Sequence, residues 1–220
     1  MVNKHKDTNK AGKFIVIDGP DGAGKSTLIA ALVARLQNEQ VPMVLTREPG
    51  GTPYAEHIRS LILSDAGKDA NPLTMLYLFN AARAEHIFGH ILPTLERGVH
   101  VISDRFDSTT YAYQVEAEQH PHLEQVFAVL RGQYIEKVTP HYIYLDVSPE
   151  IGRSRIQDRG KLNHFDARDL FWHERARGGF KGFIRKYVHH SHHDLVDAER
   201  PPQEVFEDTL AIVRRVIAQS

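Results

Sequence analysis

The sequence contains no cysteine, so it can form neither a disulfide bond nor a thiolate metal site. That absence is compatible with the cytoplasm, where we expect the protein to act. No run of 18 apolar residues is present, which argues against a membrane-spanning helix and a membrane partner. The segment before Lys13 is polar, lacks the apolar core of a secretory signal and predicts a disordered tail over residues 1–12. The formal net charge of −1 leaves no overall attraction for a nucleic acid.

Apolar runs rich in β-branched residues alternate with helical patterns, which predicts one α/β domain over residues 13–220, with a parallel sheet between two layers of helices. Five strands are expected at Phe14–Asp18, Met43–Arg47, His100–Asp104, His141–Asp146 and His193–Val196. The clearest helices are expected at Gly24–Glu39, Thr52–Ser64, Leu73–His90, Pro149–Asp158 and Pro202–Ala218. The stretch Lys161–Gly182 is dense in charge and glycine and predicts a mobile segment.

The most specific motif follows the first predicted strand, where residues Gly19–Ser26 match the phosphate-loop pattern G-x-x-x-x-G-K-S/T. Its glycines let successive backbone N–H groups point at one anion, and Lys25 adds a mobile positive charge. The hydroxyl of Ser26 is placed to bind Mg²⁺. The motif therefore predicts a three-layer P-loop NTPase fold with a nucleotide-phosphate site. The candidate residues are Gly19, Pro20, Asp21, Gly22, Ala23, Gly24, Lys25, Ser26 and Thr27.

Two arginines are expected beside this loop, because ligands collect at the carboxyl ends of parallel strands. Arg47 ends the second predicted strand, and Arg105 follows the third. A single arginine at a strand end is more often a salt-bridge partner than a ligand. Two that converge on a phosphate site favour phosphate binding, since a guanidinium binds phosphate oxygens in a bidentate fork. The implied site holds two phosphorylated groups.

These motifs together resemble the thymidylate kinases, nucleoside monophosphate kinases that transfer the γ-phosphoryl group of ATP to dTMP. The most specific part is Thr46-Arg47-Glu48-Pro49-Gly50-Gly51-Thr52, and the resemblance extends over most of the chain. Supporting parts are the Phe79-x-x-x-Arg83 spacing, Asp104-Arg105 with Ala112-Tyr113-Gln114 downstream, and Tyr144–Glu150. The resemblance implies ATP and Mg²⁺ as donor and cofactor, dTMP as the acceptor, and a role in dTTP biosynthesis. It also implies a lid over roughly residues 153–180 and a homodimer, for which the apolar helix around Leu76 and Phe79 could serve.

The resemblance implies roles for the residues that would hold the nucleoside of dTMP. Phe79 matches a phenylalanine that stacks on thymine, and Arg83 matches an arginine that hydrogen-bonds the edge of the base. Their spacing of four residues puts both side chains on one helix face. From the residues alone, Phe79 would be ordinary core. Thr110 and Tyr113 align with residues that pack against base and sugar, where a tyrosine can exclude a ribose 2′-hydroxyl.

The resemblance also assigns the residues around the acceptor phosphate. Arg47 and Arg105 match arginines that hold this phosphate close to the γ-phosphoryl group. Asp21 matches an acidic residue that meets the 3′-hydroxyl or orients the nearby arginine. Pro49, in the same motif as Arg47, belongs to the expected substrate-binding set.

Phosphoryl transfer needs positioning and charge neutralisation more than a general base. Lys25 and Arg105 are therefore expected to be catalytic. Asp104 is expected to organise a Mg²⁺-bound water or Arg105, with a plain strand-end salt bridge as the alternative.

Arginines of a lid would meet the charge of the transferring group from the donor side, and the candidates are Arg153, Arg155 and Arg159. Bacterial-type relatives carry an Asp-Arg-x-Glu stretch in the lid, whereas this chain has Asn163-His164-Phe165-Asp166. A histidine carries at best a partial charge near neutral pH. Arg159 or Arg155 would therefore have to supply more of the positive charge, and we expect both to be catalytic.

Two other functions are compatible with parts of the pattern. A kinase for another nucleoside or nucleoside monophosphate would share the phosphate loop, the Asp-Arg pair and the lid, but the Arg47–Thr52 motif argues against it. A P-loop ATPase switch would need a water-positioning group and a partner surface, and neither is evident. The cluster His189–His193 lacks a carboxylate pattern for a metal site and is expected at the end of a helix.

Overall fold

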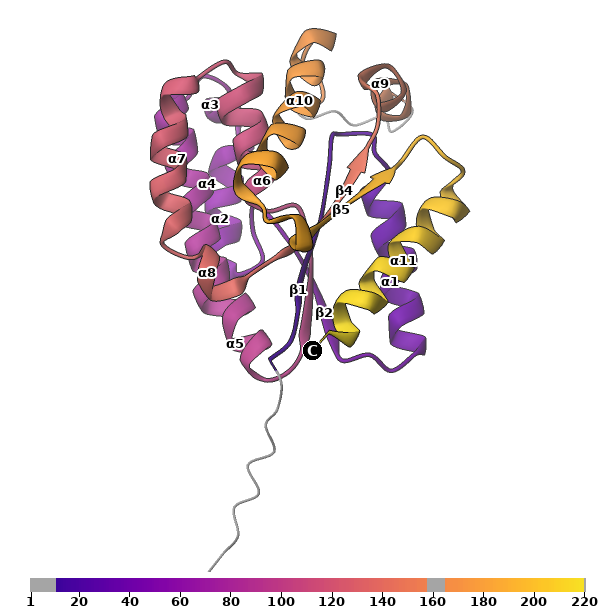
Figure 1. The fold of residues 1–220 in the computed structure, drawn as a ribbon. Helices are drawn as coiled ribbons and strands as arrows, with labels where there is room; N and C mark the ends of the chain where they lie inside the picture. Colours follow the sequence, from indigo (N-terminus) through magenta and orange to yellow (C-terminus); the bar gives the residue numbers. More distant parts are fainter. Residues whose placement is uncertain (1–10, 158–164, 220) are drawn as a thin grey trace, which may run out of the picture.

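The computed structural model describes residues 11–157 and 165–219. Its five strands form one parallel sheet in the order β2-β3-β1-β4-β5 (Figure 1). The strands are β1 (Phe14–Asp18), β2 (Met43–Arg47), β3 (His100–Asp104), β4 (His141–Asp146) and β5 (His193–Asp197). All five were predicted, and only β5 differs, ending one residue later than expected. The predicted α/β architecture with a five-stranded parallel sheet is confirmed.

Strand β1 lies at the centre of the sheet, and its position explains its composition. All five of its residues are buried, because strands cover both of its edges and helices cover both of its faces. In the register, Ile17 lies opposite Asp104 of β3 on one side and Ile143 of β4 on the other. The carboxyl end of β1 therefore opens between its two neighbours, at the position where parallel sheets bind ligands.

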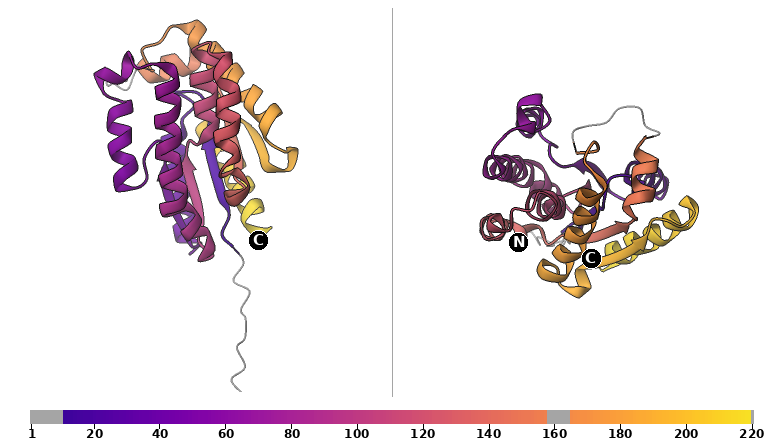
Figure 2. Two further views of the ribbon diagram at one scale, coloured as in Figure 1. Left: turned by 90° about the vertical axis from the view of Figure 1, so that its left-hand side faces the viewer. Right: turned by 90° about the horizontal axis from the view of Figure 1, so that it is seen from above.

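The helices form the two outer layers (Figures 1 and 2). They are α1 (Lys25–Asn38), α2 (Pro53–Ile62), α3 (Asp65–Lys68), α4 (Pro72–His86), the π-helical η1 (Ile87–Ile91), α5 (Leu92–Glu96), α6 (Asp107–Thr110), the π-helical η2 (Tyr111–Ala117), the short 3₁₀ helix η3 (Pro121–Leu123), α7 (Glu124–Gly132), α8 (Ile135–Val138), α9 (Pro149–Gln157), α10 (Leu170–Tyr187), the 3₁₀ helix η4 (His190–His192) and α11 (Pro202–Ala218). Helices α1 and α11 pack on one face of the sheet, with Leu32 and Val213 in their core. Helices α4, α7 and α10 cover the other face, where Leu76, Phe127 and Phe183 are buried.

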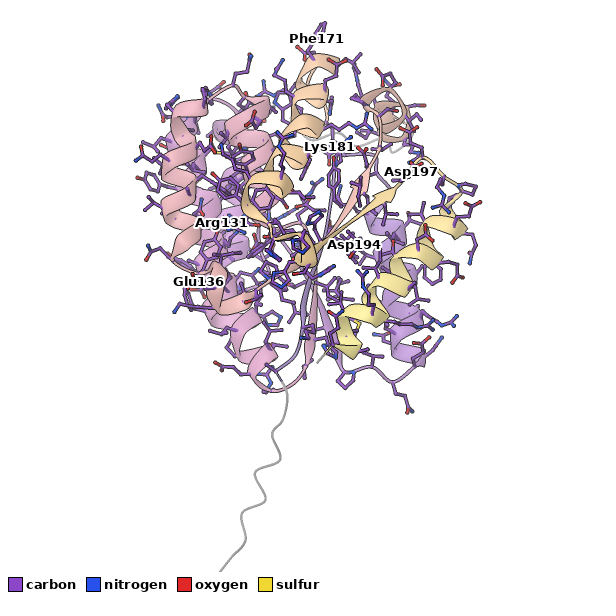
Figure 3. All side chains as sticks on the ribbon, in the orientation of Figure 1. Arg131, Glu136, Phe171, Lys181, Asp194 and Asp197 are labelled. Atoms are coloured by element: carbon purple, nitrogen blue, oxygen red, sulfur yellow. The ribbon has the colours of Figure 1, made fainter. Side chains whose placement is uncertain are left out.

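Helix α10 corrects the expectation of a mobile segment over Lys161–Gly182. From Leu170 onward that expectation is wrong, because Trp172, Phe180 and Phe183 of this helix are buried in the core. The helix is also tied to the sheet, since Asp146 at the end of β4 pairs with Arg177 at 2.6 Å and with Lys181 at 2.8 Å. Figure 3 shows Lys181 at the same end of the sheet as Asp197, which ends β5. The Asp146 carboxylate thus ties α10 to the sheet.

Three further expectations need adjustment. The α-helix predicted over Leu73–His90 ends at His86 and continues as the π-helical turn η1. Leu76 and Phe79 cannot form a dimer contact, because their exposed fractions are 0% and 6%. Of the predicted N-terminal tail, only residues 11 and 12 are described, and the backbone N–H of Gly12 donates to the Leu95 carbonyl at 2.7 Å. The rest of that tail lies outside the described residues.

Candidate active site

The phosphate loop leads from β1 into α1, and α9 packs directly on it. Gly22 has a φ of 81°, and a Cβ atom built there would lie 2.1 Å from the Gly152 carbonyl oxygen of α9. Gly24 caps α1 with a φ of 84°, in the same left-handed region. Only glycine satisfies the space and the backbone conformation at Gly22. The loop is therefore held in one shape by contacts that side chains would prevent.

The side chain of Lys25 contacts the backbone of the phosphate loop. Its ammonium group donates to the carbonyl oxygens of Gly19 and Pro20, at 2.8 Å each. Burial, with a contribution from the charge of Arg105, lowers the pKa of Lys25 to about 8. The protein therefore holds this cation against backbone carbonyls of the phosphate loop.

A cavity of about 590 Å³ opens beside the loop, between α1 and α11. Its walls include Gly24, Thr27, Ala198 and Phe206, which present mostly backbone and apolar atoms. Arg155 of α9 also lines it and donates to the Ala198 carbonyl at 2.9 Å. The cavity borders the segment after β5 and the phosphate loop, which the sequence predicts to bind the phosphates of the donor nucleotide.

A smaller cavity of about 140 Å³ lies on the opposite side of the loop, between the carboxyl ends of β1, β2 and β3. It brings together six of the predicted substrate-binding residues: Asp21, Arg47, Pro49, Phe79, Arg105 and Tyr113. These side chains come from five separate stretches of sequence. The structure therefore supports a second site across Asp21 from the donor side.

Arg105 is the most constrained cation of this cavity. Its guanidinium pairs with the Asp21 carboxylate and donates to the Gly19 carbonyl and the Thr109 hydroxyl, both at 3.2 Å. The second Asp21 oxygen accepts from the Tyr113 hydroxyl at 2.7 Å. Burial raises the pKa of Asp21, but Arg105, Lys25 and the Tyr113 hydroxyl outweigh it and lower the pKa overall. Asp21 is therefore a carboxylate that orients an arginine, as one of its predicted roles requires.

Arg83 and Thr110 lie behind the small cavity and are not in its lining. The buried Arg83 guanidinium donates to Glu48 at 2.7 Å, to the Thr110 hydroxyl at 2.8 Å and to the Phe106 carbonyl at 3.2 Å. Glu48 in turn contacts His86 and lines the cavity itself. The inward-facing guanidinium of Arg83 thus has protein partners, and its contact with a base remains a prediction.

Three residues of this region were missed from the sequence. Arg59 lines the small cavity and donates to the Pro49 carbonyl at 2.7 Å. The signal in the sequence that could have identified Arg59 is its spacing. It follows the buried Ala55 by four residues, which puts both on the same face of α2. Gln114 is 4% exposed, and its Nε2 atom has no hydrogen-bond partner among the residues that the structure describes. Asp18 is a buried carboxylate at the end of β1, where an acidic residue interrupts an apolar run.

Asp104 and Ser26 fit the Mg²⁺ site expected from the sequence. Asp104 Oδ1 is buried without a hydrogen-bond partner, and the residue makes no salt bridge within the described part of the chain. Both residues line one hollow next to Arg47. Among the described residues no cluster of three or more metal-ligating side chains exists. Mg²⁺ commonly uses one or two protein oxygens together with substrate phosphates, so this donor set suits it.

The predicted lid arginines are only partly described. Arg159 and His164 lie outside the described residues. Arg153 follows Gly152, the residue of α9 that touches the phosphate loop, and is partly exposed. Arg155 faces the larger cavity. The histidine cluster begins two residues after α10 ends at Tyr187, as its position at a helix end predicted.

The fold is that of a P-loop kinase-like protein, with one cavity on each side of its phosphate loop. A sequence model of the family "Thymidylate kinase" matches residues 17–209. A thymidylate kinase of Exiguobacterium sp. is 38% identical over 178 residues, which are 80% of this chain and 83% of that protein. One from Shouchella clausii is 35% identical over 211 residues, 94% of this chain and 97% of that protein. One from Pseudomonas fluorescens is 38% identical over 192 residues, 86% and 89% of the two chains.

The chain belongs to the thymidylate kinase family, whose members are nucleoside monophosphate kinases. This confirms the resemblance drawn from the sequence motifs. Within the described residues, the helices are all too short or too polar to cross a membrane.

Proposed function

We propose that this chain transfers the γ-phosphoryl group of ATP to the 5′-phosphate of dTMP, which yields dTDP and ADP. The observation that carries this proposal is the grouping of Arg47, Arg59 and Arg105 in one small cavity, across Asp21 from the phosphate loop. Three guanidinium groups suit a phosphate dianion. Two anion sites that share one loop suit a transfer between two phosphates.

On the donor side, the backbone N–H groups of the loop and the Lys25 ammonium would bind the phosphates of ATP. The base would occupy the cavity of about 590 Å³, against Ala198 and the guanidinium of Arg155. Ser26 and Asp104 would hold Mg²⁺, Asp104 through a water molecule. When bound, Mg²⁺ neutralises charge on the phosphate oxygens.

On the acceptor side, the roles follow the position of each side chain. Arg47, Arg59 and Arg105 would hold the phosphate of dTMP, while Phe79 and Tyr113 would contact base and sugar. Arg83 with Thr110 would read the edge of the base. Gln114, the residue after Tyr113, has a buried Nε2 atom with no hydrogen-bond partner among the described residues, which supports a further contact near that side.

The chemistry requires no general base from the protein. An oxygen of the acceptor phosphate attacks the γ-phosphorus, and the bond between that phosphorus and the β,γ-bridging oxygen breaks as ADP leaves. The acceptor oxygen is already ionised at neutral pH. The residues of this chain therefore act by alignment and charge: Lys25 and Arg105 meet the two phosphates, and a lid arginine, proposed to be Arg159, meets the transferring group.

A coupled assay that offers dTMP, dUMP, dCMP or AMP with ATP and Mg²⁺ tests this function. We expect the highest kcat/KM with dTMP. Equal rates on all four acceptors would favour a less selective nucleoside monophosphate kinase. Loss of ATP without an acceptor would instead favour an ATPase switch.

The proposal includes a cytoplasmic homodimer. Large apolar side chains of α2 and α4 are exposed: Tyr54 at 66%, Leu61 at 58% and Tyr77 at 50%. The two helices pack on one another and present these side chains outward. A second copy would cover them, and sedimentation equilibrium of the protein and of a Tyr77→Ser variant would detect the association and its loss.

A further inference from the structure

Asp18 lies beneath the phosphate loop and is 1% exposed. Its Oδ1 accepts from the Gly19 backbone N–H at 2.8 Å and from the Thr109 hydroxyl at 2.7 Å. Its Oδ2 accepts from the Ser108 hydroxyl at 2.5 Å and from the Phe106 backbone N–H at 3.3 Å. One carboxylate thus joins the first peptide of the phosphate loop to the segment that follows β3.

That segment carries Arg105 in a backbone conformation that needs support. Arg105 has a φ of 70°, in the left-handed region that non-glycine residues rarely adopt. Its guanidinium donates to the Thr109 hydroxyl, which itself donates to Asp18. The nearest Arg105 nitrogen lies 3.6 Å from Asp18 Oδ1. Asp18 therefore acts on Arg105 through the Thr109 hydroxyl, through the adjacent Phe106 peptide and through its charge.

The Gly19 peptide is shared by the two sides of the site. Its N–H donates to Asp18, and its carbonyl oxygen accepts from two cations, Lys25 at 2.8 Å and Arg105 at 3.2 Å. Lys25 belongs to the donor side and Arg105 to the acceptor side. A donor phosphate that attracts the Lys25 ammonium would leave this carbonyl to Arg105 alone.

We propose that Asp18 is a positioning residue that couples the donor and acceptor sites by holding the Gly19 peptide and the Thr109 hydroxyl against Arg105. Donor binding then strengthens the hold on Arg105 and raises the affinity for the acceptor, and by linkage the acceptor raises the affinity for the donor. This inference rests on the proposed role of Arg105 in binding the acceptor phosphate. Asp21 differs from Asp18, because Asp21 lines the acceptor cavity and Asp18 does not.

The variant Asp18→Asn keeps the shape of the side chain and removes its charge. The amide NH₂ replaces one acceptor oxygen and cannot accept from the N–H of Gly19 or Phe106. We expect the KM for dTMP to rise about tenfold, consistent with loss of one charge-assisted contact. The Kd of the β,γ-imido analogue of ATP, measured by calorimetry without dTMP, should change less than about threefold.

The decisive readout is the ratio of Kd values for dTMP with and without that ATP analogue. In the unmodified protein we expect tighter dTMP binding when the analogue is present, and in Asp18→Asn we expect a ratio near one. Thr109→Val removes the connecting hydroxyl, keeps the Asp18 charge and should reduce the ratio partly; it also serves if Asp18→Asn does not fold. A ratio near one in the unmodified protein, or an unchanged ratio in both variants, would overturn the proposal.

Asp107→Asn is the matched control. Asp107 is a second buried carboxylate of the same segment, held by Arg131 at 2.8 Å and the Tyr142 hydroxyl at 2.6 Å, away from Arg105. It should lower the melting temperature and leave the ratio unchanged. Arg105→Lys distinguishes a failure of the coupling from a failure of the proposed role of Arg105. If Arg105→Lys leaves the KM for dTMP unchanged, the assignment of Arg105 is wrong. If it raises this KM but Asp18→Asn and Thr109→Val leave the ratio unchanged, only the coupling is wrong.

Discussion

The two cavities beside the phosphate loop are built in opposite ways. The donor cavity, about 590 Å³, is lined mainly by glycines, apolar residues and backbone of α1 and of the segment from Ala198 to Phe206. The acceptor cavity, about 140 Å³, is lined mostly by charged and aromatic side chains from widely separated stretches of the chain. The donor site therefore depends on backbone shape, and the acceptor site depends on individual side chains.

The acceptor arginines are each held by a protein partner. Arg47 pairs with Glu56 at 3.1 Å, Arg59 donates to the Pro49 carbonyl, and Arg105 pairs with Asp21. Each guanidinium is thus oriented by protein contacts. Such preorganisation raises affinity and rate, because the ligand does not have to order these side chains. As a result, the acceptor site depends on each of these protein partners. Substitutions should reveal this difference from the donor site.

Arg105→Ala should have the largest effect. We expect kcat/KM for dTMP to fall about 1000-fold, because the variant removes a phosphate ligand and leaves the Asp21 carboxylate without its ion-pair partner. Binding of the ATP analogue, measured by calorimetry, should change by less than about fivefold. A comparable loss of donor affinity would show that the two cavities are not separate in function.

Arg159→Ala tests the proposed lid arginine. We expect kcat to fall about 100-fold with little change in either KM, because a lid arginine would act on the transferring group. Arg155→Ala is the matched variant, since Arg155 lines the donor cavity: there the KM for ATP should rise more than kcat falls. Turnover at the unmodified rate in Arg159→Ala would remove it from the catalytic set.

Gly22→Ala tests the backbone dependence of the donor side. The added methyl group would lie 2.1 Å from the Gly152 carbonyl oxygen, so the loop or α9 must move. We expect the KM for ATP to rise about 30-fold, as strain at a left-handed position commonly costs a few kcal/mol. Gly178→Ala, in an open part of α10, is the control and should leave the KM unchanged. An unchanged KM in Gly22→Ala would contradict a donor site set by backbone shape.

The smallest effect is a pH dependence due to Lys25, whose pKa is lowered from 10.5 to about 8. Above about pH 8 the ammonium is lost, so kcat/KM for ATP should decline. The stability of the protein should change in the opposite direction. Between about pH 8 and 10.5, Lys25 is protonated in the unfolded chain but not in the folded chain, so the free energy of unfolding rises with pH.

Chemical denaturation and initial rates across this pH range measure both trends. Lys25→Arg is the control, because a guanidinium does not titrate there. If both trends persist in that variant, another group causes them.

How much the sequence could predict differs between these regions. The strands and the phosphate loop were predictable, because apolar runs and a contiguous motif report local structure. Helix α10 was not, because Gly178, Gly179 and Gly182 argue against a helix by intrinsic propensity. Its stability comes from tertiary packing instead. A Cβ atom at Gly179 would lie 2.8 Å from the Ala112 Cα atom, so this glycine permits the close approach of α10 to η2.

The residues of the acceptor site could also be predicted only in part from the sequence. Arg47 and Arg105 could be predicted, because each sits at the end of a strand in a recognisable motif. Arg59 and Asp18 could not, because a helical arginine and a strand-end aspartate are common in any α/β domain. The role of Arg59 becomes apparent only from its hydrogen bond to the Pro49 carbonyl. That of Asp18 becomes apparent only from the hydrogen bond that it accepts from the Thr109 hydroxyl.

The sequence by itself determined the donor phosphate site, since Gly19–Thr27 are consecutive and a turn between strand and helix orients them. It also determined the order of strands and helices along the chain, through hydrophobic periodicity. Only the tertiary structure decided which side chains form the acceptor cavity and which carboxylate supports Arg105. Several of those contacts join residues more than 80 positions apart, as between Asp21 and Arg105, and sequence periodicity carries no information about such distances.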